Sequence, residues 1–226
     1  MKLSTFLLGC SLFALSFFAS AENPSPSAPE SLKNAVRQYY GFSPNDQFIL
    51  LNVKGYQQTE DYTCGPSTAM QLMRFYGMLS DSQMTRKTEL TIAKEMGSNS
   101  NSGTSPKQIV TWLKSHGFNV TYGENGNPKM LHDNLKKGIP VIVEWIDWGG
   151  HWEVVSGINM PGGKFDPAFD SLILADPAAH FLNPAKPFIE GLTMTNVDRF
   201  DSMWFDAQYF KPGHLVKGIY IIATPK

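Results

Sequence analysis

The sequence predicts an α+β fold, because apolar residues recur at helical spacing in the first half and strand-length apolar runs dominate the second. The predicted helices cover residues 31–40, 64–77, 88–96, 104–117 and 129–137. The predicted strands cover residues 47–53, 118–122, 140–146, 151–158, 171–175 and 215–223. The short segment 147–150 ends in Gly149-Gly150 and indicates a hairpin between two of these strands. We therefore expect an N-terminal helical part packed on an antiparallel β-sheet.

The first 21 residues have the three parts of a secretory signal peptide. Met1-Lys2 is basic, residues 7–18 are mainly apolar, and Ala19-Ser20-Ala21 fits a cleavage site. We predict cleavage after Ala21 and a secreted or periplasmic product. The segment 7–10 also resembles a bacterial lipobox, but most of the apolar run follows it, so lipoprotein anchoring is the weaker alternative.

Residues 22–32 are rich in Pro and Ser and predict a flexible lead-in, and residues 33–226 are predicted to form one domain. Loss of the signal peptide removes only Lys2 among the charged residues and leaves 18 basic and 20 acidic side chains. Such a balance creates no long-range field that would attract nucleic acid or anionic lipid. We therefore expect no nucleic-acid partner. We also expect no membrane span, no cofactor and a monomer.

Cys64 is the candidate nucleophile, because it lies where a predicted loop changes into a helix. Unpaired amides and aligned dipoles at a helix N-terminus favour the thiolate and lower the pKa of a thiol from about 8.5 toward roughly 3.5–7.5. The alternative is a small apolar residue in an ordinary core helix. Cys10, the other cysteine, lies in the leader, so the exported chain would carry one unpaired thiol, which is open to oxidation and needs a functional reason.

Gln58 is the candidate oxyanion donor, six residues before Cys64. Its side-chain amide and the backbone N–H of Cys64 would together supply two donors to a developing oxyanion. The alternative is a polar loop residue without a catalytic role.

His151 and Asp176 are the candidate general base and orienting carboxylate. His151 begins one predicted strand and Asp176 directly follows the next, so antiparallel pairing would bring both side chains to one end of the sheet. An imidazole that exchanges the proton of a thiol, held by a carboxylate, is the arrangement that thiol catalysis requires. Taken singly, each residue is more typical of a turn.

Three blocks of this sequence resemble the C39-like branch of the papain-like cysteine peptidases. They are Gln58-(x5)-Cys64-Gly65-Pro66-Ser67, His151-Trp-Glu-Val-Val-Ser-Gly157 and Ala175-Asp176-Pro177-Ala178. Segments 103–110 and 135–143 are also similar to segments of that group, so the resemblance covers about residues 55–180. It implies a papain-like α+β fold. It also implies that Cys64 is the nucleophile, His151 the general base and acid, Asp176 the orienting residue and Gln58 the oxyanion donor.

The departures from the family concern the substrate more than the chemistry. Familiar members are fused to peptide exporters and cut leader peptides after a double glycine, whereas this chain has no transporter domain and carries its own export signal. The connection 159–170 is longer than expected and leaves Asp166 and Asp170 as weaker candidates for the third catalytic residue. Residues 180–214 match no part of the family pattern.

The remaining histidines have no paired zinc-ligand spacing, so we expect no metal site and interpret as surface or loop residues His116, His132, His180 and His214. Three tryptophans near the candidate base predict core packing, with an aromatic wall beside the site as the alternative: Trp145, Trp148 and Trp152.

These observations predict an exported cysteine peptidase that hydrolyses peptide bonds of a peptide or protein substrate through a thioester acyl-enzyme. Two alternatives stay open. One is an acyl transferase or transpeptidase on the same fold, which shares the acyl-enzyme. The other is a non-catalytic peptide-binding module.

Overall fold

The computed structural model of the chain describes residues 26–182, 189, 191–206 and 215–226. The predicted signal peptide lies outside the described residues, as do the start of the predicted lead-in and parts of segment 180–214. In the described ranges, no helix is both long and apolar enough to cross a membrane.

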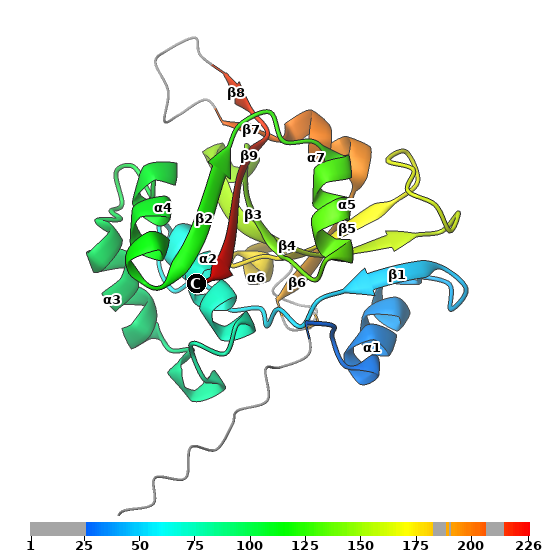
Figure 1. Ribbon diagram of the computed structural model, residues 1–226, viewed down its shortest axis with the longest axis horizontal. Coiled ribbons are helices and arrows are strands. Elements are labelled where there is room, and N and C mark those ends of the chain that lie inside the picture. The colour runs from blue at the N-terminus through cyan, green and yellow to red at the C-terminus, as the bar shows by residue number, and fades with distance from the viewer. Residues whose placement is uncertain (1–25, 183–188, 190, 207–214) are drawn as a thin grey trace, which may run out of the picture.

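Helices predominate before residue 118 and strands after residue 140 (Figure 1). The helices are α1 (Glu30–Tyr40), α2 (Cys64–Phe75), α3 (Arg86–Met96), α4 (Pro106–Ser115), α5 (Pro128–Lys136), α6 (Ala179–Leu182) and α7 (Val197–Met203), with short 3-10 turns at Asp81–Gln83 and Asp147–Gly149. The strands are β1 (Gln47–Leu50), β2 (Phe118–Gly123), β3 (Val141–Trp145), β4 (His151–Met160), β5 (Ser171–Ala175), β6 (Leu192–Asn196), β7 (Phe205–Asp206), β8 (Val216–Lys217) and β9 (Ile219–Pro225).

One antiparallel sheet organises the domain, with strand order β2-β9-β3-β4-β5-β6. The ten-residue strand β4 is its centre. On one edge, β4 pairs first with β3 and then with β1, and on the other edge it pairs with β5. Every residue of β3 and β4 is buried, so any polar side chain on these two strands has been removed from water at a cost and needs a partner.

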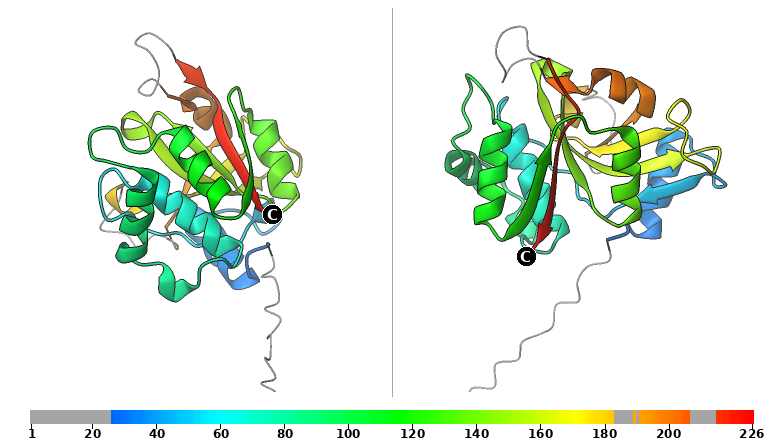
Figure 2. Two further views of the ribbon diagram at one scale, coloured as in Figure 1. Left: turned by 60° about the vertical axis from the view of Figure 1, so that its left-hand side comes forward. Right: turned by 45° about the horizontal axis from the view of Figure 1, so that its top comes forward.

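Helices cover both faces of the sheet. In Figures 1 and 2, α2, α3 and α4 gather on one side, and α5 and α7 lie across the sheet from them. Helix α4 begins where the sequence signals are strongest, since Ser105 and Gln108 form a reciprocal capping box and Pro106 occupies the first turn. The α+β class predicted from the sequence is confirmed.

The structure differs from the predicted elements in several places. Within the predicted lead-in, the backbone N–H of Ala28 donates to the carbonyl of Leu50, that of Asn52 donates to the carbonyl of Pro26, and the Ala28 side chain is buried. The folded unit therefore begins before residue 33. The sequence also missed α6, β6, α7 and β7, which lie in short stretches of weak periodicity. Of these, β6 extends the main sheet beyond β5, whereas β7 pairs with β8 in a separate two-stranded sheet.

Candidate active site

Cys64 is the first residue of α2 and is buried, and it is a free thiol. The helix begins against the segment that precedes α4. An added Cβ on Gly65 would lie 2.8 Å from Cβ of Thr104, so only a glycine permits this approach. Thr104 is also attached to the sheet, because its carbonyl accepts a 2.8 Å hydrogen bond from the indole N–H of Trp152 on β4. The start of α2 is thereby fixed against β4.

His151 and Asp176 meet at one end of the β4–β5 pair. The strands are antiparallel, with Val154 opposite Ala175, which brings the start of β4 beside the residue that follows β5. Nε2 of His151 lies 2.9 Å from Oδ1 of Asp176. The same carboxylate oxygen accepts a 2.7 Å hydrogen bond from the backbone N–H of Ala178, which fixes its orientation. Both side chains are buried.

Cys64 and His151 are also hydrogen-bonded to each other. Because Nε2 faces Asp176, Nδ1 is the imidazole nitrogen left for the thiol. The structure therefore brings three of the four predicted site residues into one line, from thiol to imidazole to carboxylate.

The electrostatics of this line favour a thiolate and an imidazolium. Burial raises the pKa of the Cys64 thiol. The hydrogen bond and charge of His151, with backbone hydrogen bonds from Trp152 and Gly65, outweigh burial, so this pKa lies below its ordinary value. Burial lowers the pKa of His151, but the hydrogen bonds to Asp176 and Cys64 outweigh it and hold this pKa well above the ordinary value. Such opposed shifts are typical of an activated cysteine.

The fourth predicted residue, Gln58, is buried in the loop that leads to Cys64. Its side-chain amide donates a 2.8 Å hydrogen bond to the carbonyl of Glu60, and its backbone N–H donates to the carbonyl of Pro177. Among the described residues, no hydrogen bond joins Gln58 to Cys64. The loop is nevertheless attached directly to the turn that follows Asp176.

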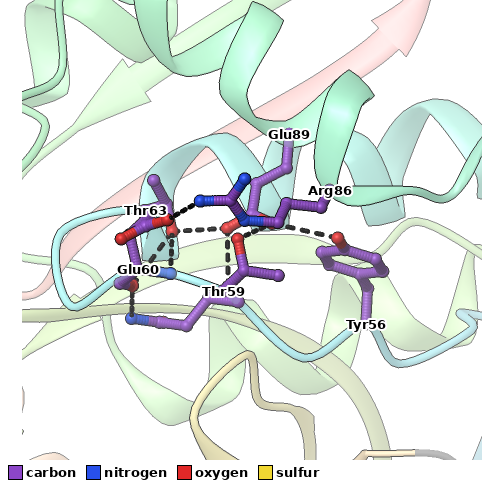
Figure 3. Close-up of polar contacts among 7 residues, drawn as sticks. Tyr56, Thr59, Glu60, Thr63, Arg86 and Glu89 are labelled. Atoms are coloured by element: carbon purple, nitrogen blue, oxygen red, sulfur yellow. Dashed lines mark hydrogen bonds and ion pairs between the residues drawn. The ribbon is translucent and has the colours of Figure 1, made fainter.

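A buried carboxylate on α3 holds this loop in place (Figure 3). Glu89 accepts hydrogen bonds from the hydroxyl of Tyr56 at 2.9 Å and from both the backbone N–H and the hydroxyl of Thr59 at 2.8 Å. It also accepts one from the hydroxyl of Thr63, the residue before Cys64. Glu89 therefore fixes the loop on both sides of Gln58. Sequence reasoning missed Glu89, because no local pattern links it to residues 56–63.

Two further buried carboxyl groups lie near the line of three residues. Oε1 of Glu153 is 3.5 Å from Nε2 of His151. Burial, followed by the negative charge of Asp176, raises the pKa of Glu153 well above its ordinary value. On β3, burial and the charge of Asp206 raise the pKa of Glu144 in the same way, and the charge of Cys64 adds to this effect. Strand alternation could have found Glu153, because residues i and i+2 share one face of a strand.

The weaker candidates for the third residue lie elsewhere. Asp170 directly precedes β5 and is buried near the end of β4, opposite to the end that carries His151. Its carboxylate accepts a hydrogen bond from the backbone N–H of Asp166. These two aspartates therefore serve the long β4–β5 connection.

The other histidines that the structure describes make local contacts: His116 stacks on Trp112, His132 stacks on Phe165, and His180 is hydrogen-bonded to Gln57. His214 lies outside the described residues, and so does the side chain of Trp148. Trp145 and Trp152 are buried, as core packing predicts. Trp145 also lines a cavity of about 480 Å³, together with Asp176.

A helix with a cysteine at its N-terminus, packed on an antiparallel sheet, is the papain-like cysteine peptidase fold. A sequence profile of the Peptidase_C39 like family matches residues 50–191, more than half of the chain, so the chain belongs to that family. The resemblance found in the sequence is confirmed.

Solved structures agree with this assignment of fold. The peptidase domain of Streptococcus ComA, a bifunctional ABC transporter of a quorum-sensing pathway, is 21% identical, with a TM-score of 0.52 over 77% of this chain and 100% of that one. A putative C39-like peptidase from Bacillus anthracis is 14% identical, with a TM-score of 0.52 over 80% of this chain and 99% of that one. A search of curated protein sequences found no match.

Proposed function

We propose that this chain is a cysteine peptidase in which Cys64, His151 and Asp176 form the catalytic triad. The observation that carries the proposal is the buried line from thiol to imidazole to carboxylate, with the pKa of Cys64 lowered and that of His151 raised. Membership of the C39-like peptidase family supports a peptide or protein substrate.

The geometry supports a two-step hydrolysis. The Cys64 thiolate attacks the carbonyl carbon of a peptide bond, and a carbon–sulfur bond forms. Nδ1–H of His151 then gives its proton to the leaving amine as the carbon–nitrogen bond breaks. In the second step, water gives a proton to Nδ1 and its hydroxide attacks the thioester, which releases the acid and restores the thiolate. Asp176 holds the imidazole with Nδ1 toward the sulfur.

Gln58 is the proposed side-chain donor to the oxyanion. Its amide gives one N–H to the carbonyl of Glu60, which leaves the second N–H for a substrate oxygen. The backbone N–H of Cys64, at the start of α2, is the second donor. The Glu89 network positions Gln58, because it holds the residues on either side of it.

The test is mass spectrometry after brief exposure to a stoichiometric thiol-directed peptidyl electrophile. We expect fast labelling of the wild type, collapse in His151→Ala and slower labelling in Asp176→Asn. The matched control is His132→Ala, because His132 stacks on Phe165 away from the thiol. Labelling no faster than a free thiol, and equal in the wild type and His151→Ala, would overturn the triad and leave a peptide-binding module.

The proposed peptidase is exported. The support is the signal-peptide pattern of residues 1–21, with Ala19-Ser20-Ala21 before the cut. The mass of the secreted or periplasmic product should correspond to a chain that begins at Glu22. A product that retains the leader in the cytoplasm would contradict export.

A further inference from the structure

We propose that His151, Glu153 and Asp176 form a binding site for a divalent transition-metal ion of the zinc type, and that the bound metal inhibits the active site. The sequence contains no paired zinc-ligand spacing, but strand pairing brings together one imidazole nitrogen and two carboxylates from two adjacent strands. Zinc takes this kind of donor set, a histidine nitrogen with carboxylate oxygens.

The distances suit a tetrahedral ion. One ligand atom from each side chain can be chosen so that all three lie within 4.8 Å of one another. Nε2 of His151 is 2.9 Å from Oδ1 of Asp176 and 3.5 Å from Oε1 of Glu153. Ligands at about 2.0–2.2 Å from zinc are about 3.3–3.6 Å apart in a tetrahedron, so small side-chain rotations produce the required geometry.

The buried carboxyl group of Glu153 is the feature that points to a missing ligand. Its side chain is only 1% exposed, and among the described residues its Oε2 makes no hydrogen bond. Nε2 of His151 can carry at most one N–H, and Asp176 already lies at hydrogen-bonding distance from it. The indole N–H of Trp145 is near Glu153 but makes no hydrogen bond of normal geometry. A divalent cation between the two carboxylates would satisfy both of them.

An ion has a route to this site. The cavity of about 480 Å³ is lined by Glu153 and Asp176 on the sheet and by Arg199 on α7. Asp147 adds a third carboxylate to the lining and partly offsets the charge of Arg199. The cavity also provides room for water as a fourth ligand, as in zinc sites with an open position.

Metal binding would inhibit by removing the imidazolium that acts as the acid. The ion takes the lone pair of Nε2, whose proton is released to solvent, and the carboxylate of Asp176 becomes a metal ligand. The ring keeps one proton, on Nδ1 toward the Cys64 thiolate, but it is a neutral imidazole and therefore a much weaker acid toward the leaving amine than an imidazolium. This inhibition rests on the proposed peptidase function, whereas the binding of the metal does not.

The test is isothermal titration calorimetry of the folded chain with Zn²⁺ alone. A thiolate is a strong zinc ligand, so Cys64→Ala separates this site from simple capture by the cysteine. We expect Cys64→Ala to bind one Zn²⁺ with unchanged or nearly unchanged affinity, and Glu153→Gln in that background to bind at least about 10–100-fold more weakly. The matched control is Asp147→Asn, which removes a carboxylate from the same cavity but not from the ligand set, and it should bind within about threefold of its parent.

A second measurement keeps the proposal testable if Glu153→Gln is poorly folded. Co²⁺ in the Cys64→Ala background should give the visible bands of a tetrahedral site, and Asp176→Asn should abolish them. In the chain with Cys64 intact, one equivalent of Zn²⁺ should slow release of the amine from a peptidyl anilide, and Glu153→Gln should remove this effect.

Loss of Zn²⁺ binding in Cys64→Ala, or equal binding by Glu153→Gln and its parent, would overturn the metal site. Turnover in a protein that binds no Zn²⁺ would overturn the metal site alone. Zn²⁺ binding in a protein without any peptidase activity would leave the site standing and overturn the proposed function.

Discussion

Replacing Glu89 by glutamine tests whether one carboxylate holds the loop that carries Gln58. The loop reaches Glu89 through Tyr56, Thr59 and Thr63, and each of these residues donates a hydrogen bond to it (Figure 3). In Glu89→Gln one carboxylate oxygen becomes an amide NH₂ group, which is a donor. The hydrogen bonds at that oxygen are then lost or must be remade in the opposite direction.

The expected cost follows from the number of bonds. The oxygen Oε2 accepts from the hydroxyls of Tyr56 and Thr59, and a hydrogen bond to a charged group contributes roughly 1.5–3 kcal/mol. The hydroxyls can rotate and accept hydrogen bonds from the new NH₂ group, which restores part of the lost free energy. We therefore expect Glu89→Gln to lower the free energy of unfolding by about 2–4 kcal/mol, a large share of the roughly 5–15 kcal/mol of a typical domain.

The assay is urea unfolding together with the rate of thiol labelling. The control is Glu60→Gln, in the same loop, which removes an ion pair with Arg86 whose side chains are 32% and 62% exposed. An exposed pair of this kind contributes about 0–1 kcal/mol, so this variant should unfold and label almost as the wild type does. Glu89→Gln should also label more slowly, because the loop leads directly into Cys64.

The reasoning would be refuted by a loss of less than about 1 kcal/mol in Glu89→Gln, or by a loss equal to that of Glu60→Gln. A stability loss with unchanged labelling would show that Glu89 stabilises the domain without positioning the site.

Three further predictions concern the site and its surroundings. Labelling of Cys64 should rise with pH at values below the ordinary thiol pKa of about 8.5, because the thiolate forms as pH passes its lowered pKa; in Asp176→Asn this rise should move to higher pH in a stopped-flow profile. Gly65→Ala should lower the free energy of unfolding by about 1–3 kcal/mol in urea, because the new methyl group overlaps Thr104; a neutral result would contradict the close approach. Because its pKa is raised, Glu144 keeps its proton in the folded state at pH values above its ordinary pKa of 4.5. The free energy of unfolding should therefore fall as the pH rises above 4.5, by at most about 1.4 kcal/mol per pH unit. Glu144→Gln should flatten this fall in urea titrations.

The sequence by itself placed the three candidate triad residues on the right helix and strands. Cys64 begins a helix, His151 begins a strand and Asp176 follows the next one. Each of these placements depends on local signals, such as helical spacing, a glycine turn and a strand end, which need no knowledge of distant contacts. The order of the three blocks along the chain was enough to indicate the family.

Only the tertiary structure decided which other groups share the site. Glu89 lies more than 20 residues along the chain from the loop that it holds. Glu153 is a candidate metal ligand only because strand pairing brings it near Asp176, the residue that follows the neighbouring strand β5. The packing of residues 26–29 and the position of β6 at the sheet edge likewise depend on backbone hydrogen bonds between distant segments. Sequence periodicity reports which face of an element is buried, but it does not report which distant polar group meets that face. Pairing of strands and helices alone determines those contacts.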